Sequence, residues 1–532
     1  MRFIKIFSFL ILITCILFLY NYQNLIAQNN DLDLLSELDV EMQPEKKNSD
    51  DDLFNDLDEE IEDKTQKQNL NILSQLYKNL SGNIRARYYW FCRDLDTSTD
   101  EDEAENNNSD TDSEEIDSQR HFVDSIIKIS DFISYKSLRL DFNGWAEIGN
   151  QKDTYLLGSM WPQDKERHRR YFEANELYLS LFTDHFDLTL GRKIMSNGVS
   201  TLYSPANRYT NSDINDPLDP KEYGIWQTKL DLYIYDLTIT TAVLPAYNSS
   251  KSPSSTSRWA ATWADSSSEL EDDDSSIDNS TIEENYPDLT YENMSYFFRM
   301  KIPLGGWDLF LSCYHGNNSN WVLKNDETTE DSDDTENTDE IGEIDEIDET
   351  TEDDVENIIF TKEIVPVFNA SAGFSTTLNS WEFHAEALYN FTYDYKDDSY
   401  LSYVAGFRYT IDEIVKNIFL DKIDITIEYA REWKIDKQDA ENFEKSSDEL
   451  RIGKNDLITF IVIKINENFS FNYLLQYEYE EFGHLNCIGL KYRLTDDLKL
   501  ISKVELYEGN DESHFGRWKD NDRLIAILEY SF

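Results

Sequence analysis

The sequence predicts an all-β fold: a transmembrane antiparallel β-barrel of about 18 strands, with 16 as the alternative count. Three observations lead to this prediction. Segments of roughly ten to thirteen residues alternate apolar and polar side chains along much of the chain. Very short turns alternate with long polar or acidic joins. The last segment, "NDRLIAILEYSF", alternates up to an aromatic end, as expected of a strand tied into a closed sheet.

The N-terminal segment, residues 1–27, has the pattern of a secretory signal peptide. Arg2 and Lys5 precede an apolar run, and the short polar stretch that follows allows cleavage after Ala27. An uncleaved N-terminal anchor is the alternative. Nothing later in the chain approaches the ~18 consecutive apolar residues of a membrane-spanning helix. If the exported chain enters a membrane, it therefore enters as a β-barrel.

Residues 28–79 are predicted to form an acidic periplasmic linker. Its last part, "QNLNILSQLYKNL", places Leu70, Leu73 and Tyr77 at helical spacing, which allows one short helix. A frayed linker without a helix is the alternative. The predicted barrel then occupies residues 80–532.

Three acidic insertions interrupt the barrel, at residues 93–118, 249–290 and 317–360. They contain too little apolar surface to offset the entropy of ordering, so we expect disordered extracellular loops. Their sequences lack the spacing of a calcium-binding loop, so divalent cations would bind diffusely. The net charge of −58 repels phosphates and excludes nucleic acid as a partner.

The strand pattern is clear in "DKIDITIEYAREW". Ile423, Ile425 and Ile427 share one face, and Asp424 and Glu428 share the other. The same alternation appears in residues 136–148, 225–234, 380–391, 401–410, 468–480 and 497–509, and more weakly in 122–134. A soluble sandwich also alternates in this way, but its strands average ~5–6 residues.

Short turns predict which strands form hairpins. They lie near Asp184, Asp236, Gly305, Trp381, Glu467 and Asp497. In hydrocarbon every backbone N–H and C=O must be paired within the protein, so the sheet has to close. We therefore expect the final strand to pair with the first, "LSGNIRARYYWFC". The short turns would face the periplasm and the long loops the exterior.

If the apolar faces contact lipid, the opposite faces line a lumen with charges of both signs. The predicted inner-face residues are Arg139, Asp141, Glu147, Lys229, Asp231, Glu382, His384, Glu386, Arg408, Asp424, Glu428, Glu478, Lys491, Arg493, Lys499, Lys503 and Glu505. Such a lining suits a hydrated channel. The alternative is a solid polar core through which nothing passes.

The region from Glu173 to Trp259 resembles bacterial outer-membrane porin-like barrels related to alginate-export proteins. The resemblance rests on paired strands that end in a Gly-Arg step, on a loop with spaced glycine and prolines, and on a later Arg-Trp pair. These residues are Gly191, Arg192, Gly198, Pro205, Pro217, Asp219, Pro245, Arg258 and Trp259. Asn197 departs from the pattern, since that group often has Trp there.

The resemblance implies that the loop from Ser196 to Lys221 folds inward as a constriction. Its candidate residues are Arg192, Tyr203, Arg208 and Asp216. The expected function is that of an outer-membrane channel, embedded in outer-membrane lipid, for passage or export of small hydrophilic solutes, with no bound cofactor. The alternative is a surface-structural or cation-binding barrel whose acidic loops carry the function.

A lipase-like outer-membrane enzyme is a second alternative. The chain has only seven histidines and contains neither a GxSxG nor an HExxH motif. Ser312 and His315 are close in sequence, but such a pair is common by chance, so we expect no enzyme. Cys92, Cys313 and Cys487 lie on separate predicted strands and form no metal-binding motif.

Overall fold

The computed structural model describes residues 78–93, 117–151, 155–156, 168–210, 212–248, 250–253, 257–259, 281–326, 359–412, 415, 420–510 and 513–532. Every described residue belongs to one compact unit, residues 71–532. The predicted signal peptide, almost all of the linker with its helix, and most of the three acidic insertions lie outside the described residues.

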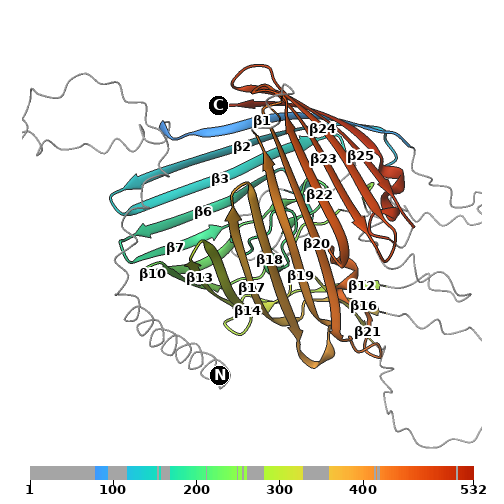
Figure 1. The fold of residues 1–532 in the computed structure, drawn as a ribbon. Helices are drawn as coiled ribbons and strands as arrows, with labels where there is room; N and C mark the ends of the chain where they lie inside the picture. The colour runs from blue at the N-terminus through green and yellow to red at the C-terminus, as the bar shows by residue number, and fades with distance from the viewer. Residues whose placement is uncertain are drawn as a thin grey trace, which may run out of the picture. The chain divides into compact units, whose positions relative to one another are not determined.

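The predicted barrel is confirmed: 18 antiparallel strands form one closed sheet (Figure 1). In order around the ring they are β1 (Ser81–Phe91), β2 (His121–Tyr135), β3 (Leu138–Gly149), β6 (Phe172–Phe182), β7 (Phe186–Lys193), β10 (Ile225–Ile234), β11 (Leu237–Leu244), β13 (Ser295–Leu304), β14 (Trp307–Asn317), β17 (Pro366–Leu378), β18 (Trp381–Thr392), β19 (Ser399–Ile411), β20 (Lys422–Asp436), β22 (Asn455–Lys464), β23 (Phe469–Glu478), β24 (His484–Arg493), β25 (Leu498–Glu508) and β26 (Arg523–Ser531).

The last strand closes the ring against the first, as the sequence predicts. β26 pairs with β1 in antiparallel register, from Asn83 opposite Ser531 to Phe91 opposite Arg523. Gly82 and Phe532 exchange two backbone hydrogen bonds of 3.0 Å each. The terminal aromatic residue is therefore part of the closure, and in Figure 1 the C-terminus lies beside β1.

The joins between strands separate into two ends of the barrel. The turn end carries short joins, such as residues 183–185, 235–236 and 379–380. The loop end carries long ones, such as 194–224 and 245–294. Two joins at the loop end are short as well: residues 393–398 connect β18 to β19, and residues 479–483 connect β23 to β24.

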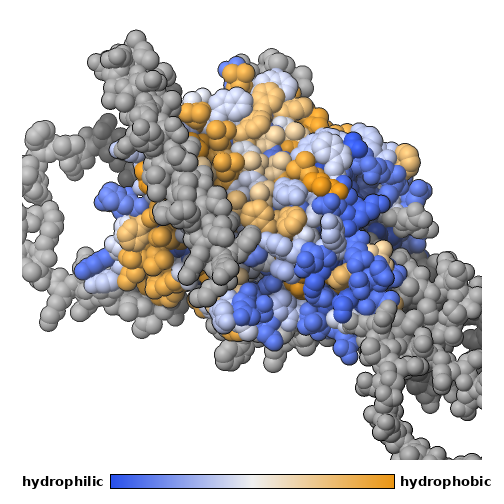
Figure 2. Space-filling model, turned by 90° about the horizontal axis from the view of Figure 1, so that it is seen from below, coloured by the Kyte–Doolittle hydropathy of each residue, from blue (hydrophilic) through white to orange (hydrophobic). Residues whose placement is uncertain are grey.

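The two faces of the sheet reverse the polarity of a soluble protein. Glu428 and Arg523 are 0% and 2% exposed, whereas Leu528 and Tyr530 are 45% and 46% exposed. Apolar side chains of the same kind cover the outer wall, and Figure 2 shows them gathered across much of the surface in that view. The outer face of the closed sheet is thus apolar and the inner face polar.

One part of the inner face is apolar, contrary to the simple expectation. Tyr89, Ile525 and Tyr507 point inward from β1, β26 and β25 and pack with Trp259 and Trp518. Both tryptophans come from loop-end segments. Strands turn apolar residues inward here because loop segments, rather than water, cover them.

Short strands and 3-10 helices lie at the loop end. A four-stranded sheet contains β12 (Thr281–Asn285), β16 (Ile359–Glu363), β15 (Val322–Asp326) and β21 (Phe443–Lys445), and two-stranded pairs join β4 (Tyr155–Leu156) to β5 (Arg169–Arg170) and β8 (Ser212–Asp213) to β9 (Lys221–Glu222). Short 3-10 helices occupy Pro205–Asn207, Tyr393–Tyr395, Ser447–Leu450 and Gly516–Asn521. Within the described ranges, no helix has the length and apolar character needed to cross a membrane.

Candidate functional site

The join between β7 and β10, residues 194–224 and here termed the inner loop, contacts the inner wall of the barrel. Its first contact is Glu386 of β18. One oxygen of that carboxylate accepts hydrogen bonds from the backbone amides of Val199 at 2.7 Å and Ser200 at 3.2 Å. The other oxygen accepts from the amide of Ala206 at 3.3 Å. Each bond is charge-assisted, which makes it stronger than one between neutral groups.

Glu428 of β20 continues this contact. Its two carboxylate oxygens accept hydrogen bonds from the amides of Thr201, Leu202 and Tyr203 at 2.9, 3.0 and 3.0 Å. A ring nitrogen of His384 lies 2.9 Å from the same carboxylate. We term Glu386, Glu428 and these six loop amides the carboxylate anchor. The loop supplies only backbone groups to it, and the wall supplies the charge.

Asn197 and Gly198 lie directly before the residues of the inner loop that contact the carboxylate anchor. The side-chain amide of Asn197 donates to the Ser312 hydroxyl on the inner face of β14 at 2.6 Å. A Cβ atom on Gly198 would lie 1.8 Å from the Ser204 hydroxyl and 2.7 Å from the Glu386 carboxylate. Any larger residue there would force the loop or these side chains to shift. Asn197 binds the wall where the resembling barrels often have Trp.

A second anchor holds the later part of the loop. Arg523 of β26 donates to both oxygens of Asp216, at 2.8 and 3.0 Å, and also pairs with Glu505 of β25 at 2.5 Å. Arg87 of β1 pairs with Asp219 at 2.7 Å. We term these pairs, with their loop carboxylates, the ion-pair anchor. In the ring, β22, β23 and β24 separate β20, which carries part of the carboxylate anchor, from β25, β26 and β1, which carry the ion-pair anchor. The inner loop therefore bridges separate parts of the wall.

Burial alone would raise the pKa of the Asp216 carboxyl. The charge of Arg523 and its hydrogen bonds instead hold this pKa well below the usual range. Asp216 is therefore ionised at neutral pH. The ion-pair anchor is extended along the inner wall, since Arg87 also contacts Asp124 of β2 at 2.6 Å and Glu147 of β3 at 3.2 Å.

Arg208 connects the inner loop to a loop-end network. Its guanidinium pairs with Glu432 of β20 at 2.5 Å, contacts the Tyr203 hydroxyl and lies 5.0 Å from the centre of the Tyr400 ring. Arg451 shares the same Glu432 at 2.8 Å and lies 4.2 Å from the same ring. Arg451 also pairs with Asp448 at 3.1 Å, so two carboxylates and an aromatic face compensate the two cations.

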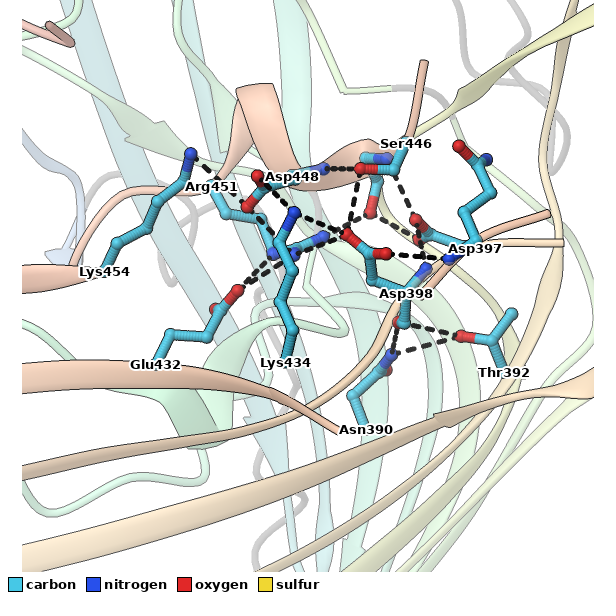
Figure 3. A network of polar contacts seen from close by, with 12 residues as sticks. Asn390, Thr392, Asp397, Asp398, Glu432, Lys434, Ser446, Asp448, Arg451 and Lys454 are labelled. Carbon is cyan, nitrogen blue, oxygen red and sulfur yellow. Dashed lines mark hydrogen bonds and ion pairs between the residues drawn. The ribbon is translucent and has the colours of Figure 1, made fainter. Parts of the chain in front are cut away.

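The network continues into the joins at residues 393–398 and 437–454 (Figure 3). Asp397 accepts a hydrogen bond from the amide of Ser447 at 3.0 Å, and Asp398 pairs with Lys434 at 3.0 Å. Burial raises the pKa of Asp448, but Arg451, Lys454 and Lys434 together outweigh it and lower the pKa to about 2. These contacts fix two neighbouring joins to each other at the loop end.

The predicted inner-face residues nearer the turn end form separate charge pairs. Arg139 lies 2.6 Å from Asp141 on β3, and Lys229 lies 2.7 Å from Asp231 on β10. Asp424 contacts Lys422 at 2.9 Å and Arg408 at 3.5 Å. The two signs thus alternate along the wall, as expected for a polar lining.

The remaining predicted residues occupy the same face. Glu382 lies opposite Arg408 in the β18–β19 register. Lys491 and Arg493 follow the inner-face alternation of β24, opposite Ile501 and Lys499 of β25, and Lys503 lies opposite Gly489. Arg192 belongs to β7 and not to the loop proper; it donates to the backbone carbonyl of Gly224 at 2.9 Å and contacts Glu173. The structure thus joins Arg192 to the base of the loop and Tyr203, Arg208 and Asp216 to its span.

Three residues central to these contacts were missed by the sequence reasoning: Arg87, Arg523 and Glu432. Each lies on a strand at a position that strand alternation turns inward, which is a usable signal. Arg87 and Arg523 were missed because inward-facing apolar neighbours, such as Tyr89 and Ile525, obscure the alternation.

The residues considered for catalysis do not form a pair. Ser312 lies on the inner face of β14, where it bonds Asn197, and His315 lies three residues on and faces outward. No group of three or more His, Cys, Asp or Glu among the described residues is arranged to hold a metal ion. Cation binding by the acidic insertions concerns mostly residues outside the described ranges.

No known protein-family profile matches the chain, and no curated protein matches it. Solved structures do match. A mutant of the porin of Rh. blastica shares 9% identity over 85% of this chain and 99% of its own, with a TM-score of 0.36. OmpT, an outer membrane protein of Vibrio cholerae, shares 8% over 85% and 98%, with a TM-score of 0.34. OccAB1 of Acinetobacter baumannii shares 7% over 85% and 96%, with a TM-score of 0.41.

The resemblance to alginate-export proteins gains no support from these comparisons. At such identities and TM-scores, a functional conclusion has to rest on the barrel itself.

Proposed function

We propose that the protein is an outer-membrane channel for the passage or export of small hydrophilic solutes. The observation that carries this proposal is the reversed polarity of the closed sheet, with apolar side chains outside and ionised side chains inside. In water the outer face would be costly to expose, whereas hydrocarbon favours it. Closure through β1 and β26 leaves no unpaired edge, which a bilayer requires.

The inner wall supports passage of polar solutes. Charges of both signs line it near the turn end, as in the pairs Arg139–Asp141 and Lys229–Asp231. Lys491, Arg493 and Lys503 would add positive charge along β24 and β25. A lining of this kind replaces part of a solute's hydration and is typical of water-filled barrels. The turn end would face the periplasm and the loop end the exterior.

The inner loop would act as the constriction of this channel. It is held to the wall at the carboxylate anchor by Glu386 and Glu428 and at the ion-pair anchor by Arg523, so it bridges the inside of the ring. Tyr203, Arg208 and Asp216 lie within the bridging span, and Arg192 supports its base.

The experiment is a liposome-swelling assay on the refolded full-length chain with a neutral sugar, a small anion and a small cation. We expect swelling that depends on solute size, and extraction of the folded protein only with detergent. A folded chain that stays soluble without detergent, or vesicles that never swell, would contradict the proposal. A variant lacking residues 327–356 distinguishes the channel from the surface-layer alternative. A channel should keep its permeability after this loss.

A further inference from the structure

One side of the inner wall near the turn end is basic. Ile501 of β25 packs against the apolar cluster inside the ring, so Lys499 and Lys503, two residues to either side, face inward as well. On β24, Leu490 and Tyr492 are 42% and 45% exposed on the outer face, so the residues that alternate with them face inward. We term the four inward cations of these two strands the basic strip: Lys491, Arg493, Lys499 and Lys503.

The cations of the basic strip lie close to one another along the wall. Arg493 is directly opposite Lys499 in the β24–β25 register, and Lys491 is opposite Ile501, which lies between Lys499 and Lys503. The two lysines of β25 are thus about 13 Å apart along the strand. Like charges directly opposite each other destabilise a sheet. An anion held between them would offset this cost.

Carboxylates compensate little of this charge. Lys499 contacts Glu529 at 3.3 Å, but Glu529 also pairs with Arg85 of β1 at 2.6 Å. Glu505, the next inward residue of β25 after the strip, pairs with Arg523 at 2.5 Å. Within the described ranges, the other three cations of the basic strip form no ion pair.

Other inward cations near the turn end differ from the basic strip. Arg139 and Lys229 each have an aspartate within 2.7 Å on the same strand. The chain also contains 106 acidic residues and only 48 basic ones. Composition alone would therefore place a carboxylate beside most cations, and the basic strip is an exception that its composition does not explain.

The cations of the basic strip are accessible to solutes. Lys491 and Arg493 are exposed, and the two lysines of β25 are partly exposed. Asp496 and Asp497, in the turn between the two strands, are exposed too, and among the residues that the structure describes they form no ion pair with the strip. A solute that enters the lumen from the turn end can therefore reach these amino and guanidinium groups.

We propose that the basic strip binds small oxyanions in the lumen and makes the channel prefer anions to cations. Ammonium and guanidinium groups hold phosphate and carboxylate oxygens by charge-assisted hydrogen bonds. Arg493 and Lys499 offer two such groups on neighbouring strands, and Lys491 and Lys503 continue them toward the ion-pair anchor. The inference rests on the proposed channel function and names its solute class, small solutes that carry a phosphate or carboxylate group.

The first experiment measures the reversal potential of the full-length chain in planar bilayers under a KCl gradient. A positive wall concentrates chloride, so in dilute salt chloride should permeate at least about threefold better than potassium. The preference should weaken at about 1 M salt, where the Debye length falls to about 3 Å. A chain that conducts without preferring chloride would overturn this inference and leave the channel proposal intact.

A double variant and a matched control locate the preference. Lys491→Gln with Lys503→Gln removes two unpaired cations of the strip, so the preference for chloride should fall at least about twofold. Lys136→Gln with Lys437→Gln removes the same charge from exposed positions in a turn and in a loop-end join, and should leave the preference unchanged. Equal falls in the two double variants would show that net charge sets the preference, and would overturn the inference.

A second readout does not depend on conductance. Isothermal titration calorimetry of the full-length chain in detergent micelles at low salt uses inorganic phosphate, succinate and glucose as probes. We expect an oxyanion to bind and glucose not to bind, and the tighter of the two anions identifies the preferred group. The strip variant should weaken this binding about threefold to tenfold, and the control should keep it.

The two proposals can fail separately in this titration. Absent binding of both oxyanions, or equal binding of glucose, would overturn the basic strip as a site. Oxyanion binding that the strip variant weakens would support the site even in a chain that does not conduct, and would then contradict the channel proposal alone.

Discussion

The two anchors of the inner loop use opposite chemistry for the same task. At the carboxylate anchor the wall supplies Glu386 and Glu428, and the loop supplies backbone amides. At the ion-pair anchor the wall supplies Arg523 and Arg87, and the loop supplies the side chains of Asp216 and neighbouring Asp219. The first anchor therefore depends on the loop's conformation and the second on its sequence.

This difference has consequences for tolerance to substitution. Side chains at residues 199–202 can vary without removing a hydrogen bond of the carboxylate anchor, provided that the backbone path is kept. Substitution of Asp216 removes a carboxylate partner of the buried Arg523, so its side chain matters directly. Substitution of the wall residues should be costly at both anchors, because each of these residues carries a buried charge.

The largest expected effect is at the ion-pair anchor. Arg523→Met leaves the buried Glu505 and the partly buried Asp216 without their cation, and breaking a buried pair in this way costs about 3–5 kcal/mol. Urea unfolding of the protein in lipid vesicles should show this loss. Arg139→Met is the matched control, because its side chain is 40% exposed and its pair is worth about 1 kcal/mol or less. Equal losses in the two variants would contradict a special role for Arg523.

The double substitution Glu386→Ala with Glu428→Ala tests the carboxylate anchor. It leaves the loop amides without their acceptors, but lumen water can replace part of the loss, so we expect about 2 kcal/mol of local destabilisation. Hydrogen exchange of the amides of Thr201 and Leu202 should then accelerate about thirtyfold. Glu382→Ala, on the same strand as Glu386 and nearer the turn end, should leave this exchange unchanged. Unchanged exchange in the double variant would show that other contacts hold the loop.

A smaller effect is expected from Gly198→Ala. The added methyl group would overlap the Ser204 hydroxyl and press on Glu386, so the loop has to shift at a cost of about 1 kcal/mol. The shift should weaken the hydrogen bonds of the neighbouring Val199 amide and raise its exchange rate several-fold. Wild-type exchange at Val199 would show that the loop accommodates a side chain here.

The smallest effect is a pH dependence of the ion-pair anchor. Because the pKa of Asp216 is lower in the folded chain than the unfolded value of ~3.9, its contribution to stability is complete above pH ~4 and is lost as the pH falls through the folded value. From pH 7 to 5, Asp216→Asn and the unchanged chain should therefore differ by a constant amount in urea unfolding. Below pH ~4 the difference should shrink; a difference that instead grew would contradict the assignment.

Strand alternation and turn length were sufficient to predict the barrel. "DKIDITIEYAREW" gives both faces of β20 directly, and the aromatic end of β26 predicts its pairing with β1. Alternation fails where loop segments replace water inside the ring: Tyr89 and Ile525 are apolar yet face inward against Trp259. Orientation by hydrophobicity alone therefore could not place Arg87 and Arg523.

The anchors themselves were only partly predictable. Glu386, Glu428 and Asp216 were candidates, since they are charged residues on an inner face or in the inward loop. Their partners were not, because Val199 and Thr201 contribute backbone amides that no residue type encodes, and because the pairing of Asp216 with Arg523 joins residues 307 positions apart. Long-range contacts of this kind follow from the closed ring and not from local sequence.

Single-channel conductance in planar bilayers tests the central claim most directly. Replacing Tyr203–Pro217 with a Gly-Ser linker removes the side chains of the bridging span and its contact with Arg523, while Gly198 and the amides of residues 199–202 remain. We predict a conductance clearly above that of the unchanged chain, with weaker discrimination between large and small solutes. A conductance identical to that of the unchanged chain would contradict the inner loop as the constriction.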